Sequence, residues 1–191
     1  MAQGPNPIEA YQGAVQQLST KFAAVTAGQH NSSTPCSEWN VQSLINHTIA
    51  VQTFANKVLS GVAVDPATMS DVAHPLPSEG AAAALKAITD TTLATLRSVD
   101  LAATIETPFG AMPAGQFIMA PITDMVVHAW DLAKATGQNT TLDSGLAELG
   151  YNVLIPFAPR GREGGAFGPE VSVPDTASFQ DRMLGLSGRT P

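Results

Sequence analysis

Apolar residues recur every three or four positions in four long stretches of the chain, which is the spacing of amphipathic helices. Pro7 suits the first turn of the first stretch, and Gly28 suits the position after its last turn. The other three stretches span residues 41–60, 80–99 and 115–136. The pattern predicts four helices of about 18 to 22 residues that bury their apolar faces against one another. The apolar positions of the first stretch are Ile8, Tyr11, Val15, Leu18, Phe22 and Val25.

Residues that start and stop helices agree with these limits. Asn40 is a suitable N-cap for the second stretch, and Gly61 and Gly137 follow the second and fourth stretches. Pro121 lies inside the fourth stretch, where the sequence allows either a place in the early turns or a kink.

Shorter elements are expected around and after the four helices. Residues 103–113 are typical of a small hairpin with a Phe-Gly turn, and residues 142–157 predict a fifth helix. A Gly- and Pro-rich loop is expected at 158–169, and a short helix at 177–186. We therefore predict an all-α fold, a four-helix bundle with a small extended cap. It forms a single domain over 1–191, with a bundle core at about 7–157 and a C-terminal tail at 158–191.

Composition narrows the classes of function. The chain has 191 residues, is 44% hydrophobic and carries a formal net charge of -7 with only nine Lys and Arg. Such a length and apolar content suffice for one buried core. The acidic balance argues against nucleic acid and anionic membranes as partners. No apolar run reaches the length of a membrane span, and the N-terminus lacks a secretory pattern. The single cysteine, Cys36, cannot form an internal disulfide, so we expect a cytoplasmic protein.

Three residues form the candidate chemistry. Asp124 and His128 are four positions apart in the fourth stretch, so their side chains leave the same face of one helix. His47 lies in the second stretch and supplies a third candidate ligand. Imidazole and carboxylate are common ligands of divalent transition metals. The hypothesis is a single divalent ion, with zinc expected first and nickel, iron and manganese also compatible with these ligands.

Plainer explanations exist for the same residues. A lone histidine on an apolar stripe, such as His47, is commonly a core histidine with one hydrogen-bond partner. Asp124 and His128 would also form an ordinary salt bridge on a solvated face. The apolar neighbours Met125 to Val127 and Trp130 favour a buried helix instead. His30 and His74 lie in turn-rich segments and are expected to take no part.

Other polar residues are candidates for the surroundings of the ion. Asp131 lies one turn beyond His128, where it would orient a ligand or cap the end of the site. Arg160 and Arg162 lie in the Gly-rich loop. An ion with three protein ligands keeps positions open, which is typical of catalytic sites. A module that binds a metal or thiol without turnover fits the same residues, and so does a non-haem iron enzyme.

Four segments resemble an actinobacterial metal-binding family of the DinB-like superfamily, related to the N-terminal domain of mycothiol-dependent maleylpyruvate isomerase. They span nearly the whole chain: residues 34–47 (TPCSEWNVQSLINH), 124–138 (DMVVHAWDLAKATGQ), 167–175 (FGPEVSVPD) and 181–189 (DRMLGLSGR).

The resemblance implies a four-helix bundle with a divalent metal at one end, held by His47, Asp124 and His128. It also implies mycothiol or a similar small thiol as cosubstrate, and a small electrophile as the other partner. The maleylpyruvate isomerases carry Glu where this chain has Asp124, whereas short members of the family share the Asp form. The function expected from the resemblance is a metal-dependent thiol S-transferase or isomerase. We also expect the loop from Arg160 to Phe167 to close over the thiol, because Gly-rich loops can move and arginine can bind a carboxylate through two hydrogen bonds. A homodimer is left open.

Overall fold

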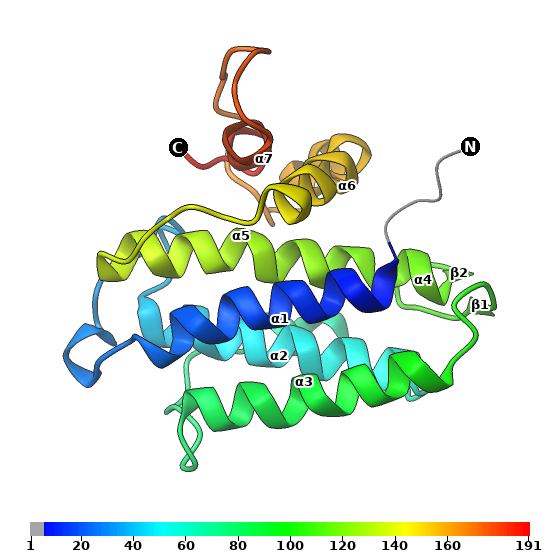
Figure 1. Cartoon of the computed structure of the whole chain (residues 1–191). Helices are drawn as coiled ribbons and strands as arrows, with labels where there is room; N and C mark the ends of the chain where they lie inside the picture. The colour runs from blue at the N-terminus through cyan, green and yellow to red at the C-terminus, as the bar shows by residue number, and fades with distance from the viewer. Residues whose placement is uncertain (1–5) are drawn as a thin grey trace.

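Four long helices surround one apolar core in the computed structural model, which describes residues 6–191. Helices α1 and α2 each pack against both α3 and α5, so the four helices enclose a common interior (Figure 1). The mostly helical fold that the sequence predicts is therefore present. The bounds of these helices are α1 Pro7–Ala23, α2 Val41–Leu59, α3 Ala81–Ser98 and α5 Met119–Thr136.

The core is built from apolar side chains of the long helices, and these include Tyr11, Leu18 and Phe22 of the predicted first stripe. Every long helix contributes side chains that are almost completely buried, and bringing them out of water is the main favourable contribution to folding. The largest of them are Tyr11, Leu18, Leu44, Ile45, Leu85, Leu96, Ile122, Met125 and Leu132.

The first helix ends earlier than its apolar pattern predicts. Helix α1 stops at Ala23, and a short 3-10 helix, η1 (Ala27–Gln29), follows in place of the expected last turn before Gly28. The Thr26 backbone N–H donates to Gln29 Oε1 at 3.0 Å, and the Gln29 N–H donates to the Thr26 carbonyl at 2.9 Å. These local bonds give the backbone an alternative to the helix, so the helix prediction for residues 24–28 was wrong.

The fourth stretch is divided into two helices. Helix α4 (Ala114–Phe117) and helix α5 meet at Ile118, and Pro121 lies in the first turn of α5. Proline is tolerated there because the first N–H groups of a helix have no partner within it. The second stretch behaves as predicted, since the Asn40 side chain caps α2 by accepting from the Ser43 N–H at 2.9 Å.

The segments between the long helices form a short β-hairpin and a 3-10 helix. The strands β1 (Thr104–Ile105) and β2 (Met112–Pro113) are antiparallel, with Ile105 opposite Met112, as the hairpin pattern predicts. A 3-10 helix, η2 (Pro66–Ser70), packs on α2. It brings the Met69 carbonyl close to one of the candidate metal ligands.

Helix α6 (Ser144–Glu163) continues six residues beyond the predicted end and includes Pro156 and Pro159. Each proline removes one helical hydrogen bond, but tertiary contacts hold the last turns in place. Ala158 is fully buried, Gly161 lies against the Phe167 ring, and Arg162 donates to the Leu186 carbonyl at 2.9 Å. The loop predicted from residue 158 therefore begins after Glu163, and Arg160 and Arg162 lie on a helix.

The C-terminal segment is folded against the outside of the four helices. Helix α7 (Phe179–Leu186) packs on α6. Both are drawn above α5 in Figure 1, on the side away from α2 and α3. Met183 and Leu184 of α7 are fully buried. Within residues 6–191, no helix has the length and apolarity that crossing a membrane requires.

Candidate metal centre

The three predicted ligands lie together between α2 and α5. His47 Nε2 is 3.2 Å and His128 Nε2 is 3.3 Å from the same oxygen, Oδ1 of Asp124. One ligand atom from each residue lies within 4.8 Å of the other two. The side chains are 12%, 22% and 7% exposed for His47, Asp124 and His128, so the cluster is largely shielded from water.

A hydrogen bond on the far side of each ring sets its protonation pattern. His47 Nδ1 lies 2.7 Å from the Met69 carbonyl oxygen, and His128 Nδ1 lies 2.8 Å from Asp131 Oδ2. Both partners only accept in their ordinary states, so each Nδ1 carries the proton and donates it. In the neutral rings both Nε2 lone pairs therefore point toward Asp124. Metal-binding histidines usually have this arrangement.

Three acceptor atoms that face one another need a positive charge between them. Asp124 Oδ2 is also buried, and it has no hydrogen-bond partner among the described residues. Burial by itself raises the pKa of Asp124, but the neighbouring His128 and His47 outweigh this effect and lower that pKa below its ordinary value. Burial by itself lowers the pKa of His128, whereas the Asp124 carboxylate raises it, so that the net pKa lies well above 6.5. Either protons on the histidines or a bound cation would supply the positive charge that these three acceptor atoms need.

The spacing of the ligand atoms also fits a cation. Two atoms that bind zinc at about 2.0 to 2.1 Å with tetrahedral angles lie about 3.3 Å apart. The observed separations from Asp124 Oδ1 are 3.2 and 3.3 Å. Two imidazoles and one carboxylate are also a ligand set that zinc accepts in proteins. The residues present therefore fit a divalent ion.

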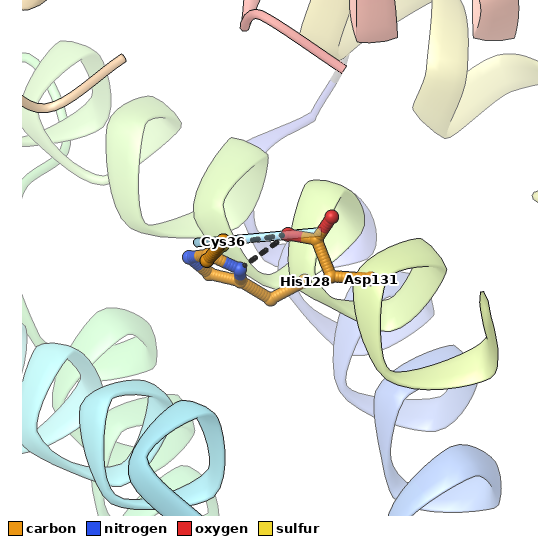
Figure 2. Close-up of side chains that lie close together, drawn as sticks. All are labelled: Cys36, His128 and Asp131. Carbon is orange, nitrogen blue, oxygen red and sulfur yellow. Dashed lines mark hydrogen bonds and ion pairs between the residues drawn. The ribbon is translucent and has the colours of Figure 1, made fainter. Parts of the chain in front are cut away.

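Asp131 joins this cluster to a second group of polar side chains. Its carboxylate is completely buried and receives two hydrogen bonds from Arg189, from Nε to Oδ1 at 3.2 Å and from Nη2 to Oδ2 at 2.8 Å. Figure 2 shows dashed lines from both His128 and Cys36 to the Asp131 carboxylate, with Cys36 Sγ 3.5 Å from Oδ2. Burial opposes ionisation of Asp131, but the bonds from His128 and the charge of Arg189 lower its pKa to about 2.

Cys36, His128 and Asp131 also lie close enough together to offer three ligand atoms. The Arg189 guanidinium already bonds to Asp131 and to Cys36 Sγ, the latter at 3.1 Å. A positive charge therefore already occupies this side of His128. The geometry favours the His47, Asp124 and His128 side for an ion.

The other candidates from the sequence lie elsewhere. His74 is exposed and His30 is half-buried, and neither belongs to a group of possible metal ligands among residues 6–191. Arg160 is exposed on α6, and Arg162 pairs with Glu170 at 3.1 Å. Within residues 6–191, no hydrogen bond or ion pair joins either arginine to the three ligands.

Sequence reasoning missed two residues beside the centre. Arg189 reaches Asp131 from the end of the chain, and the Trp39 ring lies 4.4 Å from the His47 ring and 5.9 Å from the His128 ring. Both lie in segments that carry the family resemblance, at residues 34–47 and 181–189. That resemblance was the only signal for them, because their spacing from the ligands has no local periodicity.

The fold and the site define a mostly helical protein with two largely shielded histidines that share one carboxylate. The sequence pattern of the mycothiol maleylpyruvate isomerase N-terminal domain matches residues 11–133, which is more than half of the chain. The chain belongs to this family.

Relatives cover the chain almost from end to end. Two uncharacterized proteins from two strains of Mycobacterium tuberculosis are each 32% identical over 189 residues, which is 97% of this chain and 98% of theirs. The crystal structure of the mycothiol-dependent maleylpyruvate isomerase has a TM-score of 0.69 at 13% identity. A mutant of that enzyme has a TM-score of 0.68 at 12% identity. Each match covers 97% of this chain and 79% of the solved chain, and at such identity it establishes the fold.

Proposed function

We propose that this protein binds one divalent metal ion through His47, Asp124 and His128, and uses it to activate a low-molecular-weight thiol of the mycothiol type. The reaction proposed is transfer or isomerisation on a small electrophile. The observation that carries the proposal is the convergence of two Nε2 lone pairs on Asp124 Oδ1, at 3.2 and 3.3 Å. Membership of the mycothiol maleylpyruvate isomerase N-terminal domain family supports mycothiol as the thiol. The four long helices around one apolar core are also what a DinB-like bundle would present.

Each residue would have a limited role. His47 and His128 would hold the ion through Nε2 and do no proton chemistry, since Nδ1 is already engaged with Met69 O or Asp131. Asp124 would supply the negative ligand, and Trp39 would form an apolar wall beside the His47 ring. A divalent ion, when bound, lowers the pKa of a coordinated thiol so that it is a thiolate near neutral pH. Zinc fits the ligands first, and nickel, iron or manganese are alternatives that metal analysis separates.

The first experiment tests the metal. Protein purified without an affinity tag is analysed for bound metals, then stripped and titrated with Zn²⁺, Ni²⁺, Mn²⁺ and Fe²⁺. We expect about one ion per chain. His128→Ala should abolish this binding and leave the helical content unchanged. His74→Ala is the matched control, because this histidine is exposed and lies outside the cluster, and it should bind like the wild type.

The second experiment separates an enzyme from a binding module. Metal-loaded protein is mixed with mycothiol and a panel of small electrophiles, including maleylpyruvate, and the products are measured over time. We expect multiple turnovers that His128→Ala lacks. If metal-loaded protein binds the thiol without turnover, it is a binding module. If it neither binds nor consumes any small thiol, the thiol part of the proposal is wrong.

A further inference from the structure

Arg189 approaches the metal centre from the end of the chain. It is only 8% exposed, and all three of its guanidinium nitrogens are bonded. Nε and Nη2 donate to the two oxygens of Asp131, and Nη1 donates to the Ser187 carbonyl at 2.7 Å. On its other side, Asp131 accepts from Nδ1 of His128. A continuous chain of charged hydrogen bonds therefore runs from Arg189 to a proposed ligand.

The backbone after α7 fixes where this arginine lies. The Arg189 N–H donates to the Leu184 carbonyl at 2.9 Å, and the Gly188 N–H donates to the Gly185 carbonyl at 3.1 Å. These two bonds make a Schellman motif, in which the residue after the cap is left-handed. Gly188 has φ of +81°, and a Cβ there would lie 3.0 Å from the Gly168 carbonyl oxygen. The position therefore favours glycine for two independent reasons.

The helix that carries this turn is tightly fitted to its neighbours. A Cβ at Gly185 would lie 2.5 Å from the Val171 carbonyl oxygen, and the Val171 N–H donates to the Gly185 carbonyl at 3.0 Å. The fully buried Met183 faces Gly150 of α6. This close packing resists small displacements of α7. It therefore fixes the position of the Arg189 side chain beside Asp131.

Burial makes the contact with Asp131 energetically important. A carboxylate with no exposed surface is costly unless it is paired, and removing one partner of a buried pair destabilises strongly. The two-point contact with a guanidinium also restricts the direction of the carboxylate plane. Because that carboxylate accepts the His128 Nδ1–H, its direction determines the direction of the ring. Partners of this kind usually change metal affinity by about 10- to 100-fold when they are replaced.

We propose that Arg189 is a positioning residue for the metal centre, which acts on His128 through Asp131. The C-terminal segment is then part of the site, although it supplies no ligand. This inference rests on the proposed metal binding. Because binding equilibria are reciprocal, the ion should in turn strengthen docking of the C-terminal segment.

The test compares Zn²⁺ affinity across four variants, measured by competition with a chromophoric chelator, with circular dichroism as the check on folding. Arg189→Gln should bind Zn²⁺ about 10- to 100-fold more weakly than the wild type. Arg189→Lys keeps the charge but lacks the two-point geometry, so its affinity should be intermediate. Gly188→Ala keeps the guanidinium but displaces it, and should also bind more weakly.

Arg182→Gln is the matched control. Arg182 lies on α7, the helix that leads to Arg189, with its guanidinium carbon 4.2 Å from the centre of the Tyr151 ring, and does not contact Asp131. It should lower thermal stability but leave Zn²⁺ affinity unchanged. The absorption spectrum of bound Co²⁺ should change in Arg189→Gln and stay unchanged in Arg182→Gln, which a merely structural role would not produce.

The outcomes separate the two proposals. If wild-type protein binds no metal, the proposed function fails, and this inference fails with it. If wild-type protein binds Zn²⁺ and folded Arg189→Gln has the same affinity and Co²⁺ spectrum, only the role of Arg189 is overturned. Equal losses in Arg182→Gln and Arg189→Gln would also overturn it, because general loosening of α7 would then explain both. Should Arg189→Gln not fold, Arg189→Lys and Gly188→Ala decide by the same criteria.

Discussion

Each histidine of the candidate centre has one ring nitrogen bonded to an oxygen and the other directed at Asp124. The two oxygens differ in kind, since His47 uses the backbone carbonyl of Met69 and His128 uses the carboxylate of Asp131. A carboxylate makes an imidazole more electron-rich than a carbonyl does. His128 is therefore expected to be the stronger of the two nitrogen ligands.

The fluorescence of Trp39 should report whether a metal ion occupies the candidate centre. Its ring centre is 4.4 Å from that of His47, whereas Trp130 is buried on α5 with the Lys134 ammonium 5.0 Å from its ring centre. We expect Co²⁺ binding to quench tryptophan fluorescence mainly through Trp39, because quenching by a transition-metal ion falls steeply with distance. The measurement is a Co²⁺ titration of stripped protein followed by emission.

Two substitutions show which tryptophan produces the metal-dependent change in fluorescence. Trp39→Phe should remove most of the metal-dependent change, and Trp130→Phe should keep it. Equal quenching in wild-type protein and in Trp39→Phe would place the ion away from His47.

Among the elements, α1 and α2 are joined by a buried polar contact. The Tyr11 hydroxyl donates to Gln52 Oε1 at 2.9 Å, and both side chains are completely buried. Burial raises the pKa of Tyr11 well above its ordinary value of 10.0. The contribution of this contact to stability should therefore decrease at alkaline pH.

The sign of this pH effect follows from proton linkage. Above about pH 10 the unfolded chain loses the Tyr11 proton while the folded chain keeps it. The contribution to stability is complete below pH 10 and is lost as pH rises, by at most about 1.4 kcal/mol per pH unit. We expect the free energy of unfolding, measured with urea at several pH values, to fall above pH 10.

Tyr11→Phe isolates this group. The variant should be less stable near neutral pH by about 1 to 3 kcal/mol, because Gln52 Oε1 loses its donor. Above pH 10 its stability should fall less steeply than that of the wild type. Parallel pH profiles for the two proteins would show that Tyr11 does not titrate as its burial requires.

The helices and the grouping of the candidate ligands differed in how well the sequence predicted them. Helix α2 was predicted to within a residue, because Asn40 caps it and its apolar stripe is regular. The pairing of Asp124 with His128 was also predictable, since residues four apart share a helix face. The long α6 was not, because Pro156 and Pro159 normally end a helix and the contacts that hold them come from residues 167 and 186.

The surroundings of the ligands depend on contacts between distant parts of the chain. Arg189 and Asp131 are 58 positions apart, and they meet only because α7 docks on α6. The partner of His47 is a backbone carbonyl, which any residue at position 69 would supply. Neither contact has a periodicity or a residue type that local patterns could reveal. By contrast, His47 is expected to lie near Asp124 and His128 as soon as α2 and α5 are assumed to pack against each other.

At the scale of the whole molecule, the candidate centre links helices α2 and α5 to the end of the chain. His47 comes from α2, Asp124 and His128 come from α5, and Arg189 links α5 to the end of the chain. An ion bound by folded protein and not by the unfolded chain stabilises all of these contacts together. At a free metal concentration of 100 times the dissociation constant, the gain is about 2.7 kcal/mol.

This gain predicts the size of a thermal shift. For a protein of this length, 1 kcal/mol corresponds to about 2 to 4 °C in Tm. Stripped protein should therefore melt about 5 to 11 °C lower than protein with Zn²⁺ at that ratio, and excess chelator should reverse the rise. His74→Ala should show the full shift and His128→Ala none, because only the latter removes a ligand. A shift of equal size in His128→Ala would mean that the ion binds elsewhere, and the centre between α2 and α5 would then be a charged cluster held by protons alone.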